Sequence, residues 1–325
     1  MNSSLLTVED LQTHFFTRNG VLRAVDGVSF RIASGEVVGL VGESGSGKSV
    51  TGFSIMGLVD PPGRIVGGRI RYMGEDLARV SPAQLRALRG NRIAMIFQDP
   101  MMTLNPVLSI GTQMIETVLA HKNVSQGEAR AIARDALGSV GIASPDERLD
   151  AYPHQFSGGM RQRVVIAIAM LHEPDLVIAD EPTTALDVTI QAQILAQVQR
   201  LNREFGTAVL WITHDLSVVA GLAHRLCVMY AGNIVEEGPV DMVLDHPRHP
   251  YTRGLIYSVP GQNKPGTRLK QIPGLMPSMF DPDEGCRFAP RCERRTDACG
   301  VMPPMQSAGP DRTLRCHNPH GVHQT

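Results

Sequence analysis

The chain has 325 residues, a formal net charge of −1 and 42% hydrophobic residues, so it can bury at least one large core like an ordinary globular protein. The balanced charge gives no electrostatic reason to expect nucleic-acid binding, and no apolar run approaches the roughly 20 residues of a membrane-spanning helix. The first residues, Met1-Asn2-Ser3-Ser4, lack the basic and apolar regions of a secretory signal. We therefore expect a cytosolic protein that reaches a membrane only through a partner.

An antiparallel sheet is predicted near the N-terminus. Residues 5–32 alternate apolar and polar side chains in short runs, with the hairpin signal Asn19-Gly20 between two of them. Residues 67–72 resume the alternation and are predicted to complete this sheet. Phe15 and Phe16 precede the turn, and each could either stack on an adenine ring or belong to the core. Of the two, we favour Phe16 as the base-stacking residue.

A phosphate-binding loop is predicted at Gly42-Glu43-Ser44-Gly45-Ser46-Gly47-Lys48-Ser49, which has two glycines separated by four residues and followed by Lys and Ser. The apolar residues 36–41 before it predict a buried strand, and residues 50–58 after it predict a helix. Backbone N–H groups of such a loop point at phosphate oxygens, and the helix dipole adds to the attraction. We expect Lys48 to reach the β- and γ-phosphates and Ser49 to offer its hydroxyl to Mg²⁺. The alternative is a glycine-rich turn that matches by chance.

The next part of the chain contributes one candidate residue and a helical insert. Residues 81–89 predict a helix, and the apolar residues 93–97 predict a buried strand that ends at Gln98. The Gln98 amide could reach the metal or the attacking water of a phosphate site, or it could be an ordinary surface residue. Helical spacing dominates residues 110–149, which indicates a helical insert rather than a further strand–helix unit.

A second glycine-containing corner, Ser157-Gly158-Gly159, opens another predicted helix. It resembles a small anion-binding nest at a helix N-terminus. One chain needs a single nest for its own triphosphate, so this corner makes best sense if it faces the nucleotide of a second subunit. The alternative is a plain helix start with Ser157 as the cap.

Two strand ends carry further catalytic candidates. The apolar residues 176–179 predict a buried strand that ends at Asp180 and Glu181, and ligands of α/β sheets bind at this end. Asp180 is predicted to hold Mg²⁺, directly or through water, and Glu181 to act as the general base or to orient water for attack on the γ-phosphate. Residues 189–204 predict an amphipathic helix. Residues 208–212 predict another buried strand that leads to His214, which could donate a hydrogen bond to the γ-phosphate.

In this order, the elements above resemble the nucleotide-binding subunit of an ABC transporter over about residues 5–260. The resemblance implies that two such subunits pair head to tail, each ATP lying between the phosphate loop of one and the Ser157-Gly158-Gly159 corner of the other. It also adds residues 185–187, and so Asp187, to the nucleotide-binding set. Phe156 stands where many family members carry Leu, a conservative change.

Further segments resemble the oligopeptide/dipeptide importer subfamily, and among it the D-type ATPase subunits, which pair with a related F-type ATPase. They are residues 99–106, Tyr152-Pro153-His154-Gln155, His249-Pro250-Tyr251-Thr252 and Cys286-Arg287-Phe288-Ala289-Pro290-Arg291-Cys292. The resemblance implies a peripheral protein at the cytoplasmic face of a bacterial inner membrane, with two permease subunits and a periplasmic or extracellular peptide-binding protein as partners. Permease contact is expected at residues 99–106. Nickel and haem importers remain open as alternatives, as does a soluble ABC ATPase without a transport role.

The C-terminal tail concentrates four of the five cysteines: Cys286, Cys292, Cys299 and Cys316. In a reducing cytosol such a group favours a metal over disulfides. Thiolates bind both Zn²⁺ and [4Fe–4S] clusters, but structural zinc sites usually contain closer Cys pairs than these. The resemblance to dipeptide-importer subunits also points to a [4Fe–4S] cluster, with zinc or four free thiols as alternatives. A structural role is expected, because the tail has few apolar residues and a metal would cross-link it.

We therefore predict an α/β fold: a P-loop NTPase (RecA-like) core with an antiparallel β subdomain, an α-helical subdomain at about residues 99–170 and a small Cys-rich C-terminal appendage. Residues 1–260 are predicted to form the ATPase domain, and residues 261–325 the metal-binding region. The predicted activity is ATP hydrolysis that powers the import of dipeptides or oligopeptides.

Overall fold

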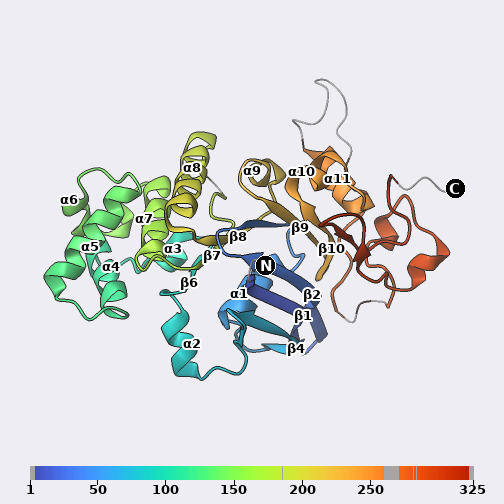
Figure 1. The fold of residues 1–325 in the computed structure, drawn as a ribbon, viewed down its shortest axis with the longest axis horizontal. Coiled ribbons are helices and arrows are strands. Elements are labelled where there is room, and N and C mark those ends of the chain that lie inside the picture. Colours follow the sequence, from blue (N-terminus) through green and yellow to red (C-terminus); the bar gives the residue numbers. More distant parts are fainter. Residues whose placement is uncertain (1–3, 185, 260–270, 281, 283, 322–325) are drawn as a thin grey trace. The chain divides into compact units, whose positions relative to one another are not determined.

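The computed structural model describes residues 4–184, 186–259, 271–280, 282 and 284–321 (Figure 1). The proline- and glycine-containing stretch at residues 260–285, which the sequence marks as a linker to the tail, lies partly outside the described residues. The strands are β1 (Ser4–Thr17), β2 (Gly20–Ala33), β3 (Val37–Val41), β4 (Gly63–Tyr72), β5 (Glu75–Asp76), β6 (Ile93–Ile96), β7 (Leu176–Asp180), β8 (Ala208–Thr213), β9 (Arg225–Tyr230), β10 (Asn233–Pro239), β11 (Gln306–Ser307) and β12 (Thr313–Leu314). The α-helices are α1 (Lys48–Met56), α2 (Pro82–Leu88), α3 (Pro100–Thr103), α4 (Ile110–Leu119), α5 (Gln126–Ser139), α6 (Pro145–Leu149), α7 (Gly158–Met170), α8 (Val188–Phe205), α9 (Leu216–Ala220), α10 (Val240–Asp245) and α11 (Pro250–Ser258). Short 3₁₀ helices are η1 (Pro153–Gln155), η3 (Ala289–Arg291) and η4 (Asp297–Gly300).

The chain forms two compact units. The first contains Ala33–Glu36 and Arg79–Leu210, and the second contains Ser4–Ile32, Val37–Ala78 and the chain from Trp211 onward. Strand β8 begins in the first unit and ends in the second. Phosphate-loop and tail residues therefore share a unit, whereas Gln98 and Glu181 belong to the other.

The first unit combines the parallel strands β6 and β7 with a group of helices. β6 pairs with β7 in parallel register, and every residue of the two strands is buried. α5 packs against α4, α6 and α7, in the green part of the ribbon (Figure 1). Its buried residues Ala129, Ala133 and Leu137 recur every four positions, and Ser125 caps its first turn. The helical insert predicted for residues 110–149 is therefore confirmed, as α4, α5 and α6.

The longest helix of this unit, α8, has the predicted amphipathic pattern. Its buried residues Ile194, Val198 and Leu201 lie three and four positions apart, on one face of the helix. Gly206, in the left-handed conformation, ends the helix. Across the described part of the chain, no helix combines the length and apolar character that crossing a membrane requires.

The second unit contains the predicted antiparallel sheet, with the strand order β2-β1-β4-β5. Two residues, Arg18 and Asn19, separate β1 from β2, and β4 pairs with β1 in antiparallel register. The alternating sequence of β1 gives alternating burial, with Leu6, Val8 and Leu11 in the core. This part of the fold is confirmed as predicted.

A second set of strands in this unit leads to the phosphate loop. β3 pairs in parallel with β9, and β9 pairs in antiparallel register with β10. All five residues of β3 are buried, as expected for a strand covered on both faces. β10 also pairs with β12, and β12 with β11, so the tail contributes two short strands to this unit.

The tail is held by strand pairing and buried ion pairs, and the predicted metal cluster is wrong. In the described residues, which include Cys286, Cys292, Cys299 and Cys316, no group of three or more His, Cys, Asp or Glu side chains is placed to hold a metal ion. Burial raises the pKa of the Cys316 thiol to about 11, and it also raises the pKa values of Cys286 and Cys292. With no such group arranged, neither the predicted [4Fe–4S] cluster nor its zinc alternative is supported in the described residues.

Ion pairs hold the tail in place, a role that the sequence analysis predicted for a metal. Arg312 is paired with Glu236, and both side chains are buried. Arg287 pairs with Asp26 in the same unit. Although the tail has few apolar residues, Phe288 and Leu314 are buried. Buried arginines such as Arg312 and Arg291 therefore help to order the tail.

Candidate functional site

The phosphate loop has a shape that only glycine permits at two positions. A Cβ atom at Gly42 would lie 2.1 Å from the carbonyl oxygen of Met229. At Gly47, where φ is 104°, a Cβ atom would lie 2.2 Å from the carbonyl oxygen of Ala24. Both distances are well inside van der Waals contact, so a larger residue would force the loop open. The two glycines of the motif therefore define the path of the chain between β3 and α1.

Helix α1 begins where the loop ends. Its N-cap residue is Gly47, which has no side chain to accept a hydrogen bond from the first turn. Lys48 is buried, and its ammonium group donates to the carbonyl oxygens of Gly42 at 2.8 Å and Glu43 at 3.0 Å. The buried Ser46 hydroxyl has no hydrogen-bond partner among the described residues. A buried cation, an unpaired hydroxyl and a helix N-terminus suit a bound phosphate.

The remaining loop residues differ in exposure. Ser44 and Gly45 are exposed, whereas Ser49 is partly buried in the first turn of α1. The Ser49 hydroxyl, the Gln98 amide and the Asp180 carboxylate all provide oxygen atoms, which are the ligands that Mg²⁺ prefers. The residue types therefore fit the ion that accompanies ATP. Asp180 is buried at the end of β7, as the sequence pattern indicated.

In the first unit, the structure brings Gln98 and Glu181 together. Gln98 Nε2 donates to Glu181 Oε2 at 3.3 Å, and Thr184 Oγ1 donates to the same oxygen at 2.9 Å. The contact arises because the parallel strands β6 and β7 end side by side. Glu181 has a φ of 46°, a left-handed conformation that side-chain-bearing residues rarely adopt. Such strained residues cluster at functional sites.

The Ser157-Gly158-Gly159 corner also lies in the first unit. The Ser157 hydroxyl accepts a hydrogen bond from the Met160 N–H at 3.3 Å, as a helix cap does, and Ser157 and Gly158 are exposed. A Cβ atom at Gly159 would lie 2.8 Å from Cγ2 of Ile190. Asp187 caps α8, with its Oδ1 accepting from the Ile190 N–H at 2.9 Å. The corner and Asp187 thus meet at the start of α8.

Two candidates for nucleotide contact lie in the second unit. The Phe16 side chain is 39% exposed, and the guanidinium carbon of Arg64 lies 4.1 Å from its ring centre. Phe15 is less exposed and packs beside Gly63. His214 follows β8 directly and is exposed. Of the two phenylalanines, Phe16 therefore has the more accessible ring, although Arg64 covers one of its faces.

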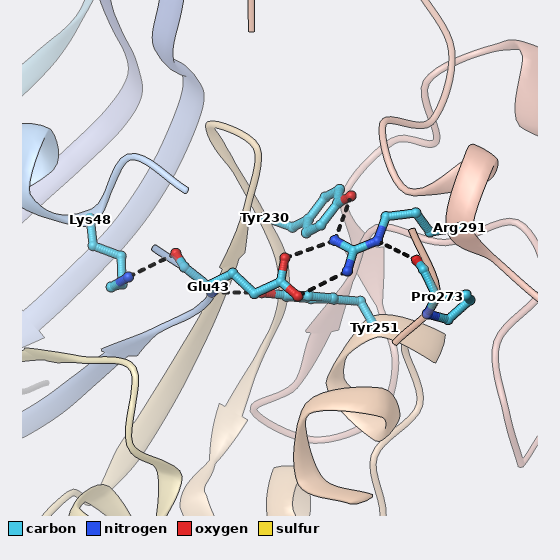
Figure 2. A network of polar contacts seen from close by, with 6 residues as sticks. All are labelled: Glu43, Lys48, Tyr230, Tyr251, Pro273 and Arg291. Atoms are coloured by element: carbon cyan, nitrogen blue, oxygen red, sulfur yellow. Dashed lines mark hydrogen bonds and ion pairs between the residues drawn. The ribbon is translucent and has the colours of Figure 1, made fainter. Parts of the chain in front are cut away.

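Two residues that contact the phosphate loop were missed as site residues. The Tyr251 hydroxyl accepts a hydrogen bond from the Glu43 N–H at 2.8 Å, and Arg291 donates two hydrogen bonds to the Glu43 carboxylate (Figure 2). In the sequence both stood out only as parts of subfamily motifs. Their separation from Glu43 by more than 200 residues explains why no local pattern assigned them a role at the loop.

The helix that carries Tyr251 makes stability dependent on pH. His249 caps α11 and is buried, and burial lowers its pKa from 6.5 to about 3. The unfolded chain therefore takes up this proton near pH 6.5, whereas the folded chain stays neutral until about pH 3. The contribution of His249 to stability is present at neutral pH and is lost as the pH falls through this window. Between about pH 7.5 and about pH 5.5, the free energy of unfolding is expected to fall by about 1.4 kcal/mol because of His249.

This expectation is checked by urea unfolding at both pH values, with the His249→Asn variant as the comparison. Asparagine can still cap α11 but does not titrate. The variant should therefore lose less stability between the two pH values than the unmodified protein. Identical losses in the two proteins would show that His249 is not the responsible group.

The fold and the loop together define a P-loop NTPase with the fold of an ATP-binding cassette. The structure is similar to the dimeric, post-hydrolysis structure of the ATP-binding cassette MJ0796 bound to ADP and Pi, with a TM-score of 0.66 and 26% identity, over 72% of this chain and 98% of that one. It is also similar to cbiO1 from Clostridium perfringens, part of the ABC transporter complex cbiONQ, with a TM-score of 0.64 and 26% identity, over 75% of this chain and 92% of that one.

Comparison with related sequences identifies the family within the ATP-binding cassette proteins. Residues 25–184 match the ABC transporter family, and residues 235–299 match the oligopeptide/dipeptide transporter C-terminal region. The chain is 47% identical to the dipeptide transport ATP-binding protein DppD of Escherichia coli, with 97% of each chain covered. It is 48% identical to the oligopeptide transport ATP-binding protein AppD of Bacillus subtilis, with 97% of this chain and 96% of the relative covered. The chain therefore belongs to the ATP-binding subunits of the ABC-type dipeptide and oligopeptide transporters, a family of ATPases.

Proposed function

We propose that this protein hydrolyses ATP to power the import of dipeptides or oligopeptides across the bacterial inner membrane. The observation that carries the proposal is the similarity to dipeptide and oligopeptide transport ATP-binding proteins over almost the entire chain. The shape of the phosphate loop, with its buried Lys48, supports the ATPase part of the proposal. In this proposal residues 1–260 form the ATPase domain and residues 261–325 its C-terminal region.

Each proposed site residue has a distinct task. Lys48 leaves the carbonyls of its own loop and binds the β- and γ-phosphates. Glu181 accepts a proton from the attacking water or orients that water, while Gln98 and Thr184 hold its carboxylate. His214 donates to the γ-phosphate, and Phe16 stacks on the adenine ring. Ser49, Gln98 and Asp180 would hold the Mg²⁺ that accompanies ATP, and the ion would supply positive charge to the phosphate oxygens.

The proposed power stroke is the closure of two ATPase subunits around ATP. The exposed Ser157-Gly158-Gly159 corner of one subunit would complete the site around the triphosphate bound by the other, with Asp187 beside it. A helix N-terminus with exposed N–H groups suits the γ-phosphate. Hydrolysis removes that phosphate and lets the pair reopen. We propose a related ATPase subunit as the partner, so that the active pair is a heterodimer.

In this proposal the subunit is peripheral, at the cytoplasmic face of the membrane, where it contacts two permease subunits through residues 99–106. Met102 and Val107 in and beside this segment are exposed large apolar residues, as a protein contact requires. A periplasmic or extracellular peptide-binding protein delivers the cargo. No nucleic acid is involved.

The proposal is tested by co-purifying the chain with its neighbouring subunits and reconstituting the complex in vesicles. Dipeptide-loaded binding protein is expected to stimulate ATP hydrolysis and peptide uptake together. Stimulation by a nickel chelate or by haem, and not by peptides, would favour an importer of that cargo. A chain that hydrolyses ATP at full rate but co-purifies with no membrane subunit would indicate a soluble, non-transport ATPase.

The role of the Ser157 corner has its own test. Replacing Gly158 by Asp would place a negative charge where the γ-phosphate of the paired subunit is expected. We expect ATP binding to a single subunit to be unchanged and ATP turnover by the pair to fall by about 100-fold or more. The exposed Gly138 in α5 offers a control, Gly138→Asp, which should leave turnover near normal. Full turnover by the Gly158→Asp pair would contradict the shared site.

A further inference from the structure

The tail segment Cys286-Arg287-Phe288-Ala289-Pro290-Arg291-Cys292 contacts the phosphate loop through an arginine. The Arg291 side chain is only 6% exposed and donates to the two carboxylate oxygens of Glu43 at 2.7 and 3.0 Å (Figure 2). It also donates to the Pro273 carbonyl at 2.8 Å and to the Tyr230 hydroxyl at 3.3 Å. A bidentate arginine–carboxylate pair is both strong and directional. The guanidinium group therefore holds the Glu43 side chain in one orientation.

The backbone of Glu43 is held as well. Its N–H donates to the Tyr251 hydroxyl at 2.8 Å, and its carbonyl oxygen accepts from Lys48 at 3.0 Å. Tyr251 is fully buried, with its ring centre 4.5 Å from that of Tyr230 and 5.4 Å from that of Phe288. Phe288 belongs to the same tail segment as Arg291. This aromatic cluster fixes the position of the hydroxyl that holds the loop.

A second set of contacts connects the tail to the other end of the phosphate loop, near Ser46. Arg287 donates to the Ala231 carbonyl and to the Asp26 carboxylate. The next residue after Ala231, Gly232, donates its N–H to the carbonyl oxygen of Ser46 at 2.8 Å. Asp26 is tied to the same turn, since its N–H donates to the Gly232 carbonyl at 2.9 Å. The two arginines of one tail segment thus support the loop near Glu43 and near Ser46.

We propose that this tail segment is a buttress that sets the geometry of the phosphate loop for ATP, with Arg291 and Tyr251 as positioning residues. The proposal rests on the proposed function, in which the loop binds the phosphates of ATP. When Lys48 leaves the Gly42 and Glu43 carbonyls for the phosphates, the loop loses two internal hydrogen bonds. Contacts from Arg291 and Tyr251 remain and keep its shape. A loop that is already ordered does not have to be ordered by ATP, which strengthens binding.

The test measures ATP affinity of the full-length subunit with a fluorescent ATP analogue. Arg291→Gln and Glu43→Gln are each expected to weaken binding by about tenfold, the scale of one charge-assisted pair. The double variant should bind no more weakly than either single variant, because both changes remove the same contact. Arg291→Lys keeps the positive charge but cannot form the bidentate pair, so its ATP affinity should lie between those of the unmodified protein and Arg291→Gln. Arg295→Ala removes an exposed arginine of the same tail and should bind normally.

The kinetics of ATP hydrolysis by the assembled complex distinguish a positioning role of Arg291 from a role in the stability of the fold alone. Loss of the buttress should raise the KM for ATP and leave kcat nearly unchanged, because Glu181 belongs to the other unit. A fall in kcat at constant KM would mean that Arg291 only stabilises the fold and would overturn the proposal. Should Arg291→Gln fail to fold, Arg291→Lys and Glu43→Gln carry the same comparison.

The outcomes distinguish this inference from the proposed function. If the unmodified chain binds ATP tightly, Lys48→Ala does not, and Arg291→Gln and Glu43→Gln both bind normally, the buttress is wrong and the ATPase proposal stands. Additive losses in the double variant would also overturn the buttress, because the two residues would then act separately. If the unmodified chain and Lys48→Ala bind ATP equally poorly, both proposals fail.

Discussion

Replacing Glu181 by glutamine is expected to slow ATP hydrolysis by about 10²- to 10⁴-fold while ATP still binds. Glutamine has nearly the same shape and can still accept hydrogen bonds from Gln98 and Thr184, but it cannot take a proton from water. Because hydrolysis reopens the proposed pair, the variant should accumulate as a closed, ATP-bound dimer. Single-turnover hydrolysis and size-exclusion chromatography with ATP measure the two effects.

The chain contains a matched control for this change. Glu173 is exposed, lies in the same unit and, like Glu181, adopts a positive φ, 48° compared with 46°. Glu173→Gln therefore makes the same chemical change at a similar backbone conformation, but before the start of β7, whereas Glu181 follows the end of that strand. It should hydrolyse ATP at the normal rate. If Glu181→Gln also kept full turnover, the role proposed for Glu181 would be wrong.

Replacing Lys48 by alanine is expected to weaken ATP binding by about 100-fold or more, because a buried ammonium group would no longer meet the β- and γ-phosphates. Hydrolysis should be lost together with binding, unlike in Glu181→Gln. ATP affinity is measured by equilibrium binding of the fluorescent ATP analogue, and hydrolysis is measured as steady-state ATP turnover. Since Lys48 also bonds two carbonyls of its own loop, the thermal melting temperature without nucleotide should be recorded for the variant.

Lys122→Ala serves as the control for the loss of a lysine. Lys122 is exposed after α4, so its removal changes the net charge equally and should leave ATP affinity unaltered. Normal ATP affinity in a folded Lys48→Ala protein would contradict the phosphate role of this lysine and, with it, the proposed nucleotide site.

The strands that carry the site could be predicted because their signal is local. β3 and β7 are continuous apolar runs, and burial of every residue in them follows from that composition. Gln98 and Glu181 were each predicted from their place after such a run. The hydrogen bond between Gln98 and Glu181 forms because β6 and β7 pair in parallel. The general rule that ligands bind at the carboxyl ends of parallel strands predicts that the two residues lie near each other, but it does not predict the distance between them.

The tail could not be predicted in the same way. The concentration of cysteines in the tail suggested a metal, but the described residues contain no group of three or more His, Cys, Asp or Glu side chains placed to hold one. The residues that hold the tail are instead arginines, whose carboxylate partners are remote in sequence. Arg291 lies 248 positions from Glu43, and Arg312 lies 76 positions from Glu236. No periodicity or motif connects such pairs, because only the folded chain brings them together.

By itself, the sequence determined the phosphate loop, the strand before it and the helix after it. Their signals are short: glycines where a Cβ atom would collide, apolar residues where the chain is buried, and a lysine at a known offset. Tertiary structure alone decided that the tail supports this loop. That result depends on charged groups far apart in the sequence, such as Arg291 and Glu43, which only the folded second unit brings together.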